Sequence, residues 1–167
     1  MNRARKFLGV DGCKGGWIAA ILSSSSLEVK LYKDVGSLWC ENKDASLILV
    51  DIPICLTDTG VRQCDILARK MLDKNRKPSI FNPPAKKALY AGSYREACAI
   101  NKEVTGKKIS KQTWNLIPKI KEVNKLIRKH PEAVKILKES HPEVCFMALS
   151  KKRIKYSKKN ILGIKER

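Results

Sequence analysis

The spacing of hydrophobic and polar positions predicts strands at the beginning of the chain. Two apolar segments, residues 6–12 and 17–22, are joined by Gly15-Gly16, which is typical of a β-hairpin. Residues 27–31 then alternate between apolar and charged side chains, as in a third strand. The chain therefore begins with a predicted three-stranded antiparallel meander.

A continuous apolar run, Leu47–Val50, follows this meander and is closed by Asp51 and Pro53. A strand without alternation is typical of the middle of a parallel or mixed sheet, where both faces are buried. Proline ends the strand because it cannot donate a hydrogen bond to the ladder.

From residue 61 the apolar positions recur at helical spacing, which predicts helices over 61–71 and 114–127. A helix between them begins at a capping box formed by Ser93 and Glu96 and ends at Gly106. The order of elements predicts an α/β fold with a mixed sheet.

The end of the chain is less clearly patterned. Residues 133–140 fit either a final strand or a helix, and a short helix is predicted over 144–149. Residues 151–167 carry eight Lys or Arg against one Glu and no obvious apolar stripe. We expect a single domain over residues 1–150, followed by a basic and frayed tail.

The charge balance adds a functional hint. The 167 residues include 35 Lys and Arg against 16 Asp and Glu, which gives a net charge of +19. Such an excess suits a surface that binds nucleic acid, because neutralised phosphates release counterions. The alternative is that scattered lysines reflect genome composition and solubility.

The composition also indicates in which cellular compartment the protein resides. No apolar run reaches the roughly 18–20 residues that a membrane span needs, and no secretory hydrophobic segment follows the basic N-terminus. The six cysteines contain no C-x-x-C pair, which excludes a zinc ribbon, and we expect them to be reduced and buried. The sequence predicts a cytoplasmic protein without membrane contact and leaves its oligomeric state open.

Asp11 and Asp51 are the strongest candidates for chemistry, since each ends an apolar strand, where an uncompensated charge is costly. If the two strands are neighbours, the carboxylates face each other and a divalent cation, Mg²⁺ or Mn²⁺, relieves their repulsion. The alternative is that each aspartate only forms a turn or cap.

Three further groups each have two interpretations. The loop of Gly12, Gly15 and Gly16, to which Lys14 adds charge, either cradles a phosphate or forms a plain hairpin turn. Glu139, His141 and Glu143 either complete a metal site, with His141 as a proton carrier, or mark a helix N-terminus. The helix over 114–127, with the residues just beyond it, has a basic face formed by Lys121, Lys125, Arg128 and Lys129. This face either is merely solvated or binds phosphate.

Taken together, these segments resemble the predicted RNase H-like nucleases grouped as the family of unknown function 429. The matching stretches follow the family order across almost the whole chain. They are Gly9–Trp17, Asp51–Ile54, Arg62-x-Cys-Asp65 with Ala68-Arg69, Ser79–Phe81, Tyr94-x-Glu-Ala97, Thr105-Gly-Lys, Ser110-x-Gln112, Pro118-Lys-Ile-x-Glu-Val123 and Glu139-x-His-Pro-Glu-Val144.

The resemblance implies a ribonuclease H-like fold in which Asp11 and Asp51 hold a divalent metal. It further implies Glu143 as a third acidic ligand, with Glu139 and His141 as additional catalytic candidates. Arg62, Asp65 and Arg69, on the helix after Asp51, are expected to line the site or bind phosphate. Arg62 and Arg69, together with Lys14 and Lys119, are our candidates for substrate contacts.

The chain departs from the family pattern in places. Cys55 and Thr57 stand where Gly and Pro are usual, and Asn124 stands where Asp is expected. Family members continue past the segment matching 158–167 into a helix with a late aspartate, whereas the last aspartate here is Asp73. We therefore expect a shortened member, with residues 151–167 as the start of the missing segment.

Three functions follow from these observations. The first is a metal-dependent nuclease that hydrolyses phosphodiesters, with activity impaired by the shortened end. The second is a nucleic-acid-binding protein without catalysis that uses its basic surface. The third is an actin-like or sugar-kinase-like phosphotransferase, which normally needs two such domains.

Overall fold

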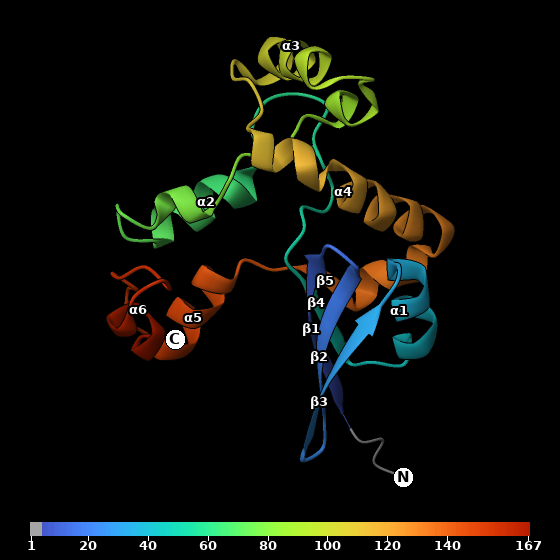
Figure 1. Cartoon of the computed structure of the whole chain (residues 1–167), viewed down its shortest axis with the longest axis vertical. Coiled ribbons are helices and arrows are strands. Elements are labelled where there is room, and N and C mark those ends of the chain that lie inside the picture. The colour runs from blue at the N-terminus through green and yellow to red at the C-terminus, as the bar shows by residue number, and fades with distance from the viewer. Residues whose placement is uncertain (1–4) are drawn as a thin grey trace. The chain divides into compact units, whose positions relative to one another are not determined.

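The computed structural model describes residues 5–167, which separate into two compact units (Figure 1). Of these residues, 5–55 and 116–140 belong to unit 1, and 56–115 and 141–167 belong to unit 2. A single helix, α4 (Lys111–Lys129), runs from the second unit into the first. The two units are described separately below.

Unit 1 contains a five-stranded mixed sheet in the order β3-β2-β1-β4-β5 (Figure 1). The strands are β1 (Lys6–Cys13), β2 (Gly16–Ser23), β3 (Ser26–Tyr32), β4 (Leu47–Val50) and β5 (Leu137–Glu139). The first three are antiparallel, and β4 pairs in parallel with both β1 and β5. The predicted α/β fold with a mixed sheet, the opening meander and the central strand are therefore confirmed.

One face of this sheet is buried beneath the helices of unit 1. Leu8, Trp17, Ala19 and Ile48 are buried there by alternation along their strands. This face lies against α1 (Val35–Asn42), for which the sequence analysis predicts no element, and against the second half of α4. Both helices lie on the same side of the sheet in Figure 1.

The opposite face carries exposed hydrophobic side chains. Leu27, Val29 and Leu31 are 63–70% exposed, although their alternation correctly predicts a strand. Their partners in β2 continue the same face, since Ile18 pairs with Leu31 and Leu22 with Leu27. The alternation of apolar and charged residues thus predicts the strand, but it does not show that the apolar side chains lie on the solvent-exposed face of the sheet.

Unit 2 is helical. Its elements are α2 (Gln63–Met71), two 3₁₀ turns (Lys77–Ser79 and Lys86–Tyr90), α3 (Tyr94–Thr105), the start of α4, α5 (Pro142–Ser150) and α6 (Ile161–Lys165). An apolar cluster joins α2 to α5, with Ala68, Leu72 and Ile80 buried against Val144 and Met147. The predicted helices over 61–71 and between residues 93 and 106 are confirmed.

The capping signals of α3 work as the sequence indicates. The Ser93 hydroxyl accepts from the Glu96 amide at 3.2 Å, and Gly106 ends the helix in the left-handed conformation with φ of 75°. The Glu96 carboxylate, however, accepts from the Gly92 amide at 2.8 Å instead of reaching back to Ser93.

Three expectations need correction. Of the two alternatives for residues 133–140, the final strand holds only for the short β5, and a 3₁₀ turn (Pro131–Lys135) precedes it. Residues 151–167 are not wholly frayed, because they contain α6 and the buried Ile154. All six cysteines are free thiols as expected, but only Cys98 is buried.

Among residues 5–167, every helix is too short or too polar to cross a lipid bilayer.

Candidate functional site

Asp11 and Asp51 lie next to each other at the carboxyl edge of the sheet in unit 1. Val10 pairs with Val50 in the parallel register of β1 and β4, and the Asp51 amide donates to the Val10 carbonyl at 3.1 Å. The aspartates directly follow this pair on strands that run about 4.8 Å apart. Asp11 is exposed and Asp51 is half-buried. The prediction that their strands are neighbours is confirmed.

Glu139 brings a third carboxylate to the same edge. It ends β5 in register with Val50, and its Oε2 accepts from the Ile54 amide at 2.8 Å. This hydrogen bond connects the end of β5 to the loop that leaves β4. Glu139 thus ends β5 and Asp51 directly follows β4. Asp11, in contrast, lies within β1, two residues before its end, so the expectation that Asp11 ends its strand is wrong.

The glycine-rich loop between β1 and β2 is a tight hairpin turn. Cys13 pairs with Gly16, so that only Lys14 and Gly15 make the turn. Gly16 has φ of 135°, and a Cβ atom there would lie 2.1 Å from the Tyr32 carbonyl oxygen. The hairpin interpretation of this loop is thus confirmed, and Lys14 is exposed at its tip.

Lys119 lies beside this hairpin. Its ammonium is 4.8 Å from the centre of the Trp17 ring and 3.3 Å from Glu122 Oε1. The Trp17 indole donates to the other oxygen of the same carboxylate at 2.7 Å. A Cβ atom at Gly12 would come within 3.5 Å of the Lys119 side chain. Of the predicted phosphate contacts, Lys14 and Lys119 thus belong to unit 1 together with Asp11 and Asp51.

The other two, Arg62 and Arg69, belong to unit 2 and lie on and beside α2. Arg62 donates to both carboxylate oxygens of Asp65, from Nε at 2.9 Å and from Nη2 at 2.7 Å. His141 Nε2 lies 3.8 Å from the same carboxylate. Burial alone would raise the pKa of Asp65, but His141 and Arg62 outweigh burial and lower it. Asp65 is therefore held as an anion.

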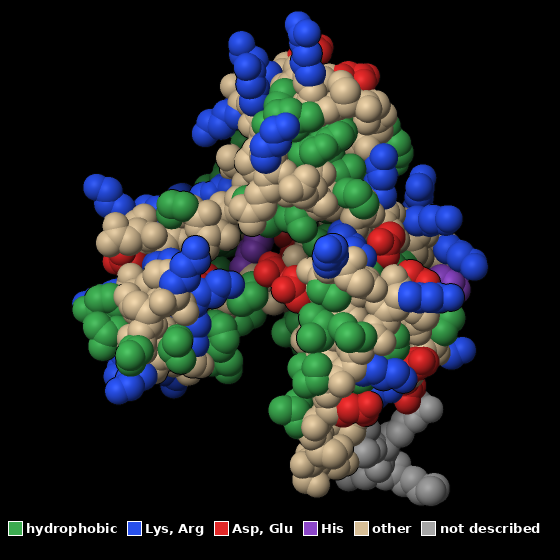
Figure 2. All heavy atoms as spheres, viewed as in Figure 1, with side chains coloured by type: hydrophobic (Ala, Val, Ile, Leu, Met, Phe, Trp, Pro, Cys, Tyr) green, Lys and Arg blue, Asp and Glu red, His purple; other side chains and the backbone are tan. Residues whose placement is uncertain are grey.

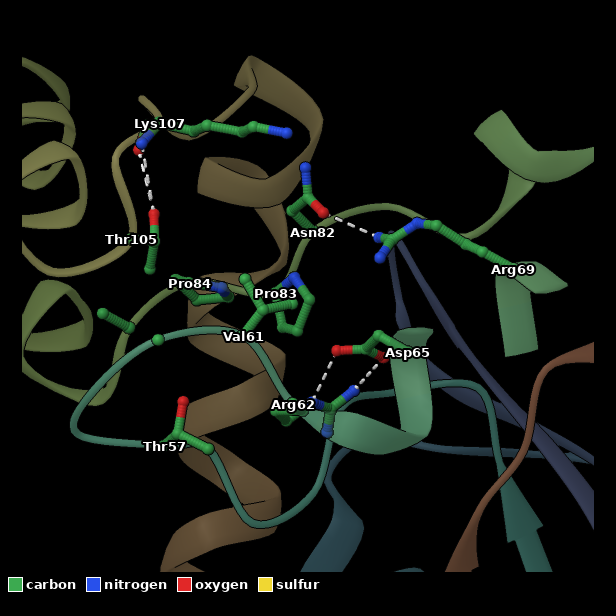
Figure 3. Close-up of a pocket in the computed structure, with 12 residues that line it drawn as sticks. Thr57, Val61, Arg62, Asp65, Arg69, Asn82, Pro83, Pro84, Thr105 and Lys107 are labelled. Carbon is green, nitrogen blue, oxygen red and sulfur yellow. Dashed lines mark hydrogen bonds and ion pairs between the residues drawn. The ribbon is translucent and has the colours of Figure 1, made fainter. Parts of the chain in front are cut away.

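A cavity of about 120 Å³ adjoins this ion pair (Figure 3). It is lined by residues of the loop before α2, by the segment after Asn82 and by Thr105 and Lys107. The buried Asn101 connects two of the segments that line the cavity. Its side chain accepts from the Ala85 amide and donates to the Lys107 carbonyl, both at 2.7 Å.

Arg69 is fixed on the far side of this cavity, where its guanidinium points to Asn82 (Figure 3). It donates to the carbonyls of Ile80 and Phe81 and to Asn82 Oδ1, at 2.7–3.2 Å. These oxygen partners orient the guanidinium without neutralising its charge.

Glu143 is held in unit 2 by two arginines. Arg76 donates to Oε1 at 2.7 Å, and Arg167 donates to both oxygens at 2.6–2.7 Å. His141 and Glu143 lie at the N-terminus of α5, with Pro142 in its first turn. This agrees with the interpretation of these residues as a helix N-terminus. The extended alternative for 139–143 holds only as far as His141, because Glu139 ends β5, His141 is extended and α5 begins at Pro142. The role of Glu143 as a metal ligand stays a prediction, and so does that of His141 as a proton carrier.

Several residues at these sites do not follow from sequence reasoning. Arg76 and Arg167 are 67 and 24 residues from Glu143, so no local pattern connects them. Asn82 and Lys107 lie in loops without periodicity. Only the Arg62–Asp65 pair carries a local signal, because a basic and an acidic residue three positions apart share one side of a helical turn.

The fold and these groups define an α/β protein with acidic residues on three adjacent strands or directly after them. The chain belongs to the family described as protein of unknown function (DUF429), whose family model matches residues 9–167. No curated protein and no solved structure matches the chain.

Proposed function

We propose that this protein is a metal-dependent nuclease of the ribonuclease H-like type that hydrolyses phosphodiesters in nucleic acid. The observation that supports this proposal is that Asp11 and Asp51 directly follow Val10 and Val50, which pair with each other on neighbouring parallel strands. Carboxylates on neighbouring strands can share a divalent cation, which offsets the repulsion between them. Their oxygen atoms are also the donors that Mg²⁺ and Mn²⁺ prefer, so the residues fit the ion.

Asp11 and Asp51 would hold the ion, with Glu139 as a further carboxylate on the same edge. When bound, a divalent ion supplies charge stabilisation for the attacking and leaving oxygens of a phosphodiester. Lys119 and Lys14 would bind phosphates of the substrate beside the β1–β2 hairpin. The Ile54 amide would keep Glu139 in place through its hydrogen bond.

The test compares wild type with Asp51→Asn in two assays. Thermal melting with and without Mn²⁺ measures binding of the ion, and cleavage of end-labelled DNA and RNA, single-stranded and double-stranded, measures activity. An ion at 100 times its dissociation constant stabilises the folded state by about 2.7 kcal/mol. We expect Mn²⁺ to raise the melting temperature of the wild type but not of Asp51→Asn, and metal-dependent cleavage to be lost in the variant.

Asp44→Asn is the matched control. Asp44 lies in the same unit, is exposed and precedes β4, so it belongs to the opposite edge of the sheet. It should keep both the Mn²⁺ response and the cleavage. If Asp51→Asn responds to Mn²⁺ like the wild type, or cleaves at the wild-type rate, the proposal is wrong.

A second candidate function is nucleic-acid binding without catalysis, and the basic face of α4 favours it. Lys121, Lys125, Arg128 and Lys129 are exposed, and Figure 2 shows Lys and Arg side chains projecting along this helix. The nearest acidic residue in the sequence, Glu122, is engaged with Trp17 and Lys119. Binding that survives the loss of both Asp11 and Asp51 would support this function.

A further inference from the structure

The charged residues that line a second and larger cavity of unit 2 are all positive. Its volume is about 460 Å³, and it lies between the segment 77–82 and the segment 108–113. Three cations line it, Arg69, Lys77 and Lys108, and its lining contains no acidic residue. Cavities of this size are typical of sites for small organic ligands.

Arg69 is the fixed cation of this cavity. All its hydrogen bonds leave from Nε and Nη2 and end on the oxygens of residues 80–82. Among the residues that the structure describes, none accepts from its Nη1 and no carboxylate pairs with it. A guanidinium that is oriented in advance and not neutralised is suited to bind an anion, particularly a planar or tetrahedral oxyanion.

The two lysines add mobile positive charge. Lys77 and Lys108 are exposed, and neither forms an ion pair within residues 5–167. Three like charges around one cavity repel each other, and an anion placed between them relieves this repulsion. The repulsion therefore favours a ligand with more than one negative charge.

The uncharged lining has both polar and apolar parts. Asn82 accepts from Arg69 through Oδ1, which leaves its amide group as a donor. Ser110 and Gln112 contribute further polar groups where α4 begins. Phe81 and Ile80 form an apolar wall that could pack against a ring.

We propose that this cavity binds a phosphate monoester, with the dianionic phosphate held by Arg69, Lys77 and Lys108 and an attached ring packed on Phe81. Two sources share this chemistry, a free nucleoside monophosphate and the 5′-phosphorylated end of a nucleic-acid strand. The site lies wholly in unit 2 and does not depend on a metal at Asp11 and Asp51.

Binding is measured by isothermal titration of the whole chain in EDTA at one fixed salt concentration. The probes are adenosine monophosphate, adenosine, and a short single-stranded oligonucleotide with either a 5′-phosphate or a 5′-hydroxyl. We expect adenosine monophosphate to bind and adenosine not to bind. Tighter binding of the phosphorylated oligonucleotide than of its hydroxyl form would assign the site to strand ends, and equal binding of the two would assign it to free nucleotides.

Lys108→Glu tests the position of the site, and Lys87→Glu is its control with the same net charge. Lys87 is exposed in unit 2 and does not line the cavity. A charge-assisted hydrogen bond contributes about 1.5–3 kcal/mol, which corresponds to roughly tenfold or more in affinity. Lys108→Glu should therefore weaken binding of adenosine monophosphate at least about tenfold, whereas Lys87→Glu should change it less than about twofold.

Two results would overturn the proposal: no binding of adenosine monophosphate, or equal weakening by Lys108→Glu and Lys87→Glu, which would indicate only general attraction to a basic protein. Circular dichroism of each variant checks that it is folded. Asp51→Asn should bind adenosine monophosphate like the wild type. Failure at this cavity therefore leaves the nuclease proposal intact, and loss of metal-dependent cleavage leaves this cavity intact.

Discussion

The Arg62 guanidinium and the Asp65 carboxylate form a two-bond ion pair across one helical turn (Figure 3). The Asp65 side chain is completely buried and that of Arg62 is 6% exposed. The resemblance suggests that Arg62 binds phosphate, but its guanidinium is committed to Asp65 through Nε and Nη2. In the structure the pair orders the start of α2 beside the smaller cavity.

Removing only one partner of this pair should be far more damaging than removing both. Arg62→Leu leaves the Asp65 carboxylate buried without its main counter-ion, which typically costs about 3–5 kcal/mol of unfolding free energy. Replacing both residues by leucine removes the stranded charge and should recover part of that loss. Urea unfolding of the two single variants and the double variant measures the coupling. A double variant less stable than either single variant would contradict this account.

The pH dependence of stability should reflect Glu143. Burial would raise its pKa, but hydrogen bonds from Arg167 and Arg76 outweigh burial and lower the pKa below the ordinary value of 4.5. Because the pKa is lower in the folded state, the carboxylate stabilises the fold above about pH 4.5. This contribution is lost as the pH falls through the folded value.

Glu143→Gln should therefore be less stable than wild type at pH 7, by about 2 kcal/mol, since the hydrogen bonds from two arginines are weakened. Below pH 4.5 the difference between the two proteins should shrink. Melting temperatures at half-unit steps from pH 3 to pH 7 measure this. A constant difference over the whole range would contradict the assignment.

Local patterns explain how much of this fold could be predicted. The meander, β4 and α3 each carry a signal within a few residues: a turn glycine, an apolar run, or a capping box at Ser93. α1 has the N-cap Asp34, which accepts from the Ser37 amide at 2.7 Å, but it is only eight residues long. The three-residue β5 takes its hydrogen bonds from β4, so its conformation depends on a distant segment.

The candidate site likewise has one part that could be predicted from the sequence and another that could not. The adjacency of Asp11 and Asp51 could be predicted because each aspartate directly follows an apolar segment that is recognisable as a strand, although β1 continues past Asp11 to Cys13. The environments of Arg62, Arg69 and Glu143 could not, because each depends on partners chosen by tertiary packing. Sequence spacing identifies the charged residues without showing which of them neutralise each other.

The β1–β2 hairpin allows a sharp comparison of neighbouring glycines. Gly16→Ala places a methyl group against the Tyr32 carbonyl at a backbone angle that alanine rarely adopts, and should cost at least about 2 kcal/mol. Gly15 has open space around its Cα, so Gly15→Ala should change stability by less than about 0.5 kcal/mol. Chemical unfolding measures both, and equal effects would show that the turn tolerates a side chain at residue 16.

The basic face of α4 predicts a specific salt dependence of nucleic-acid binding. If Lys125 and Arg128 contact phosphates, each neutralisation to glutamine should reduce the slope of log Kobs against log salt concentration by about 0.9 for duplex DNA. Lys43→Gln removes the same charge from an exposed position after α1 and serves as the control. Fluorescence anisotropy at several salt concentrations gives the slopes. If all three variants shift the slope equally, α4 is only a solvated helix surface, and the binding surface must be sought elsewhere on this basic chain.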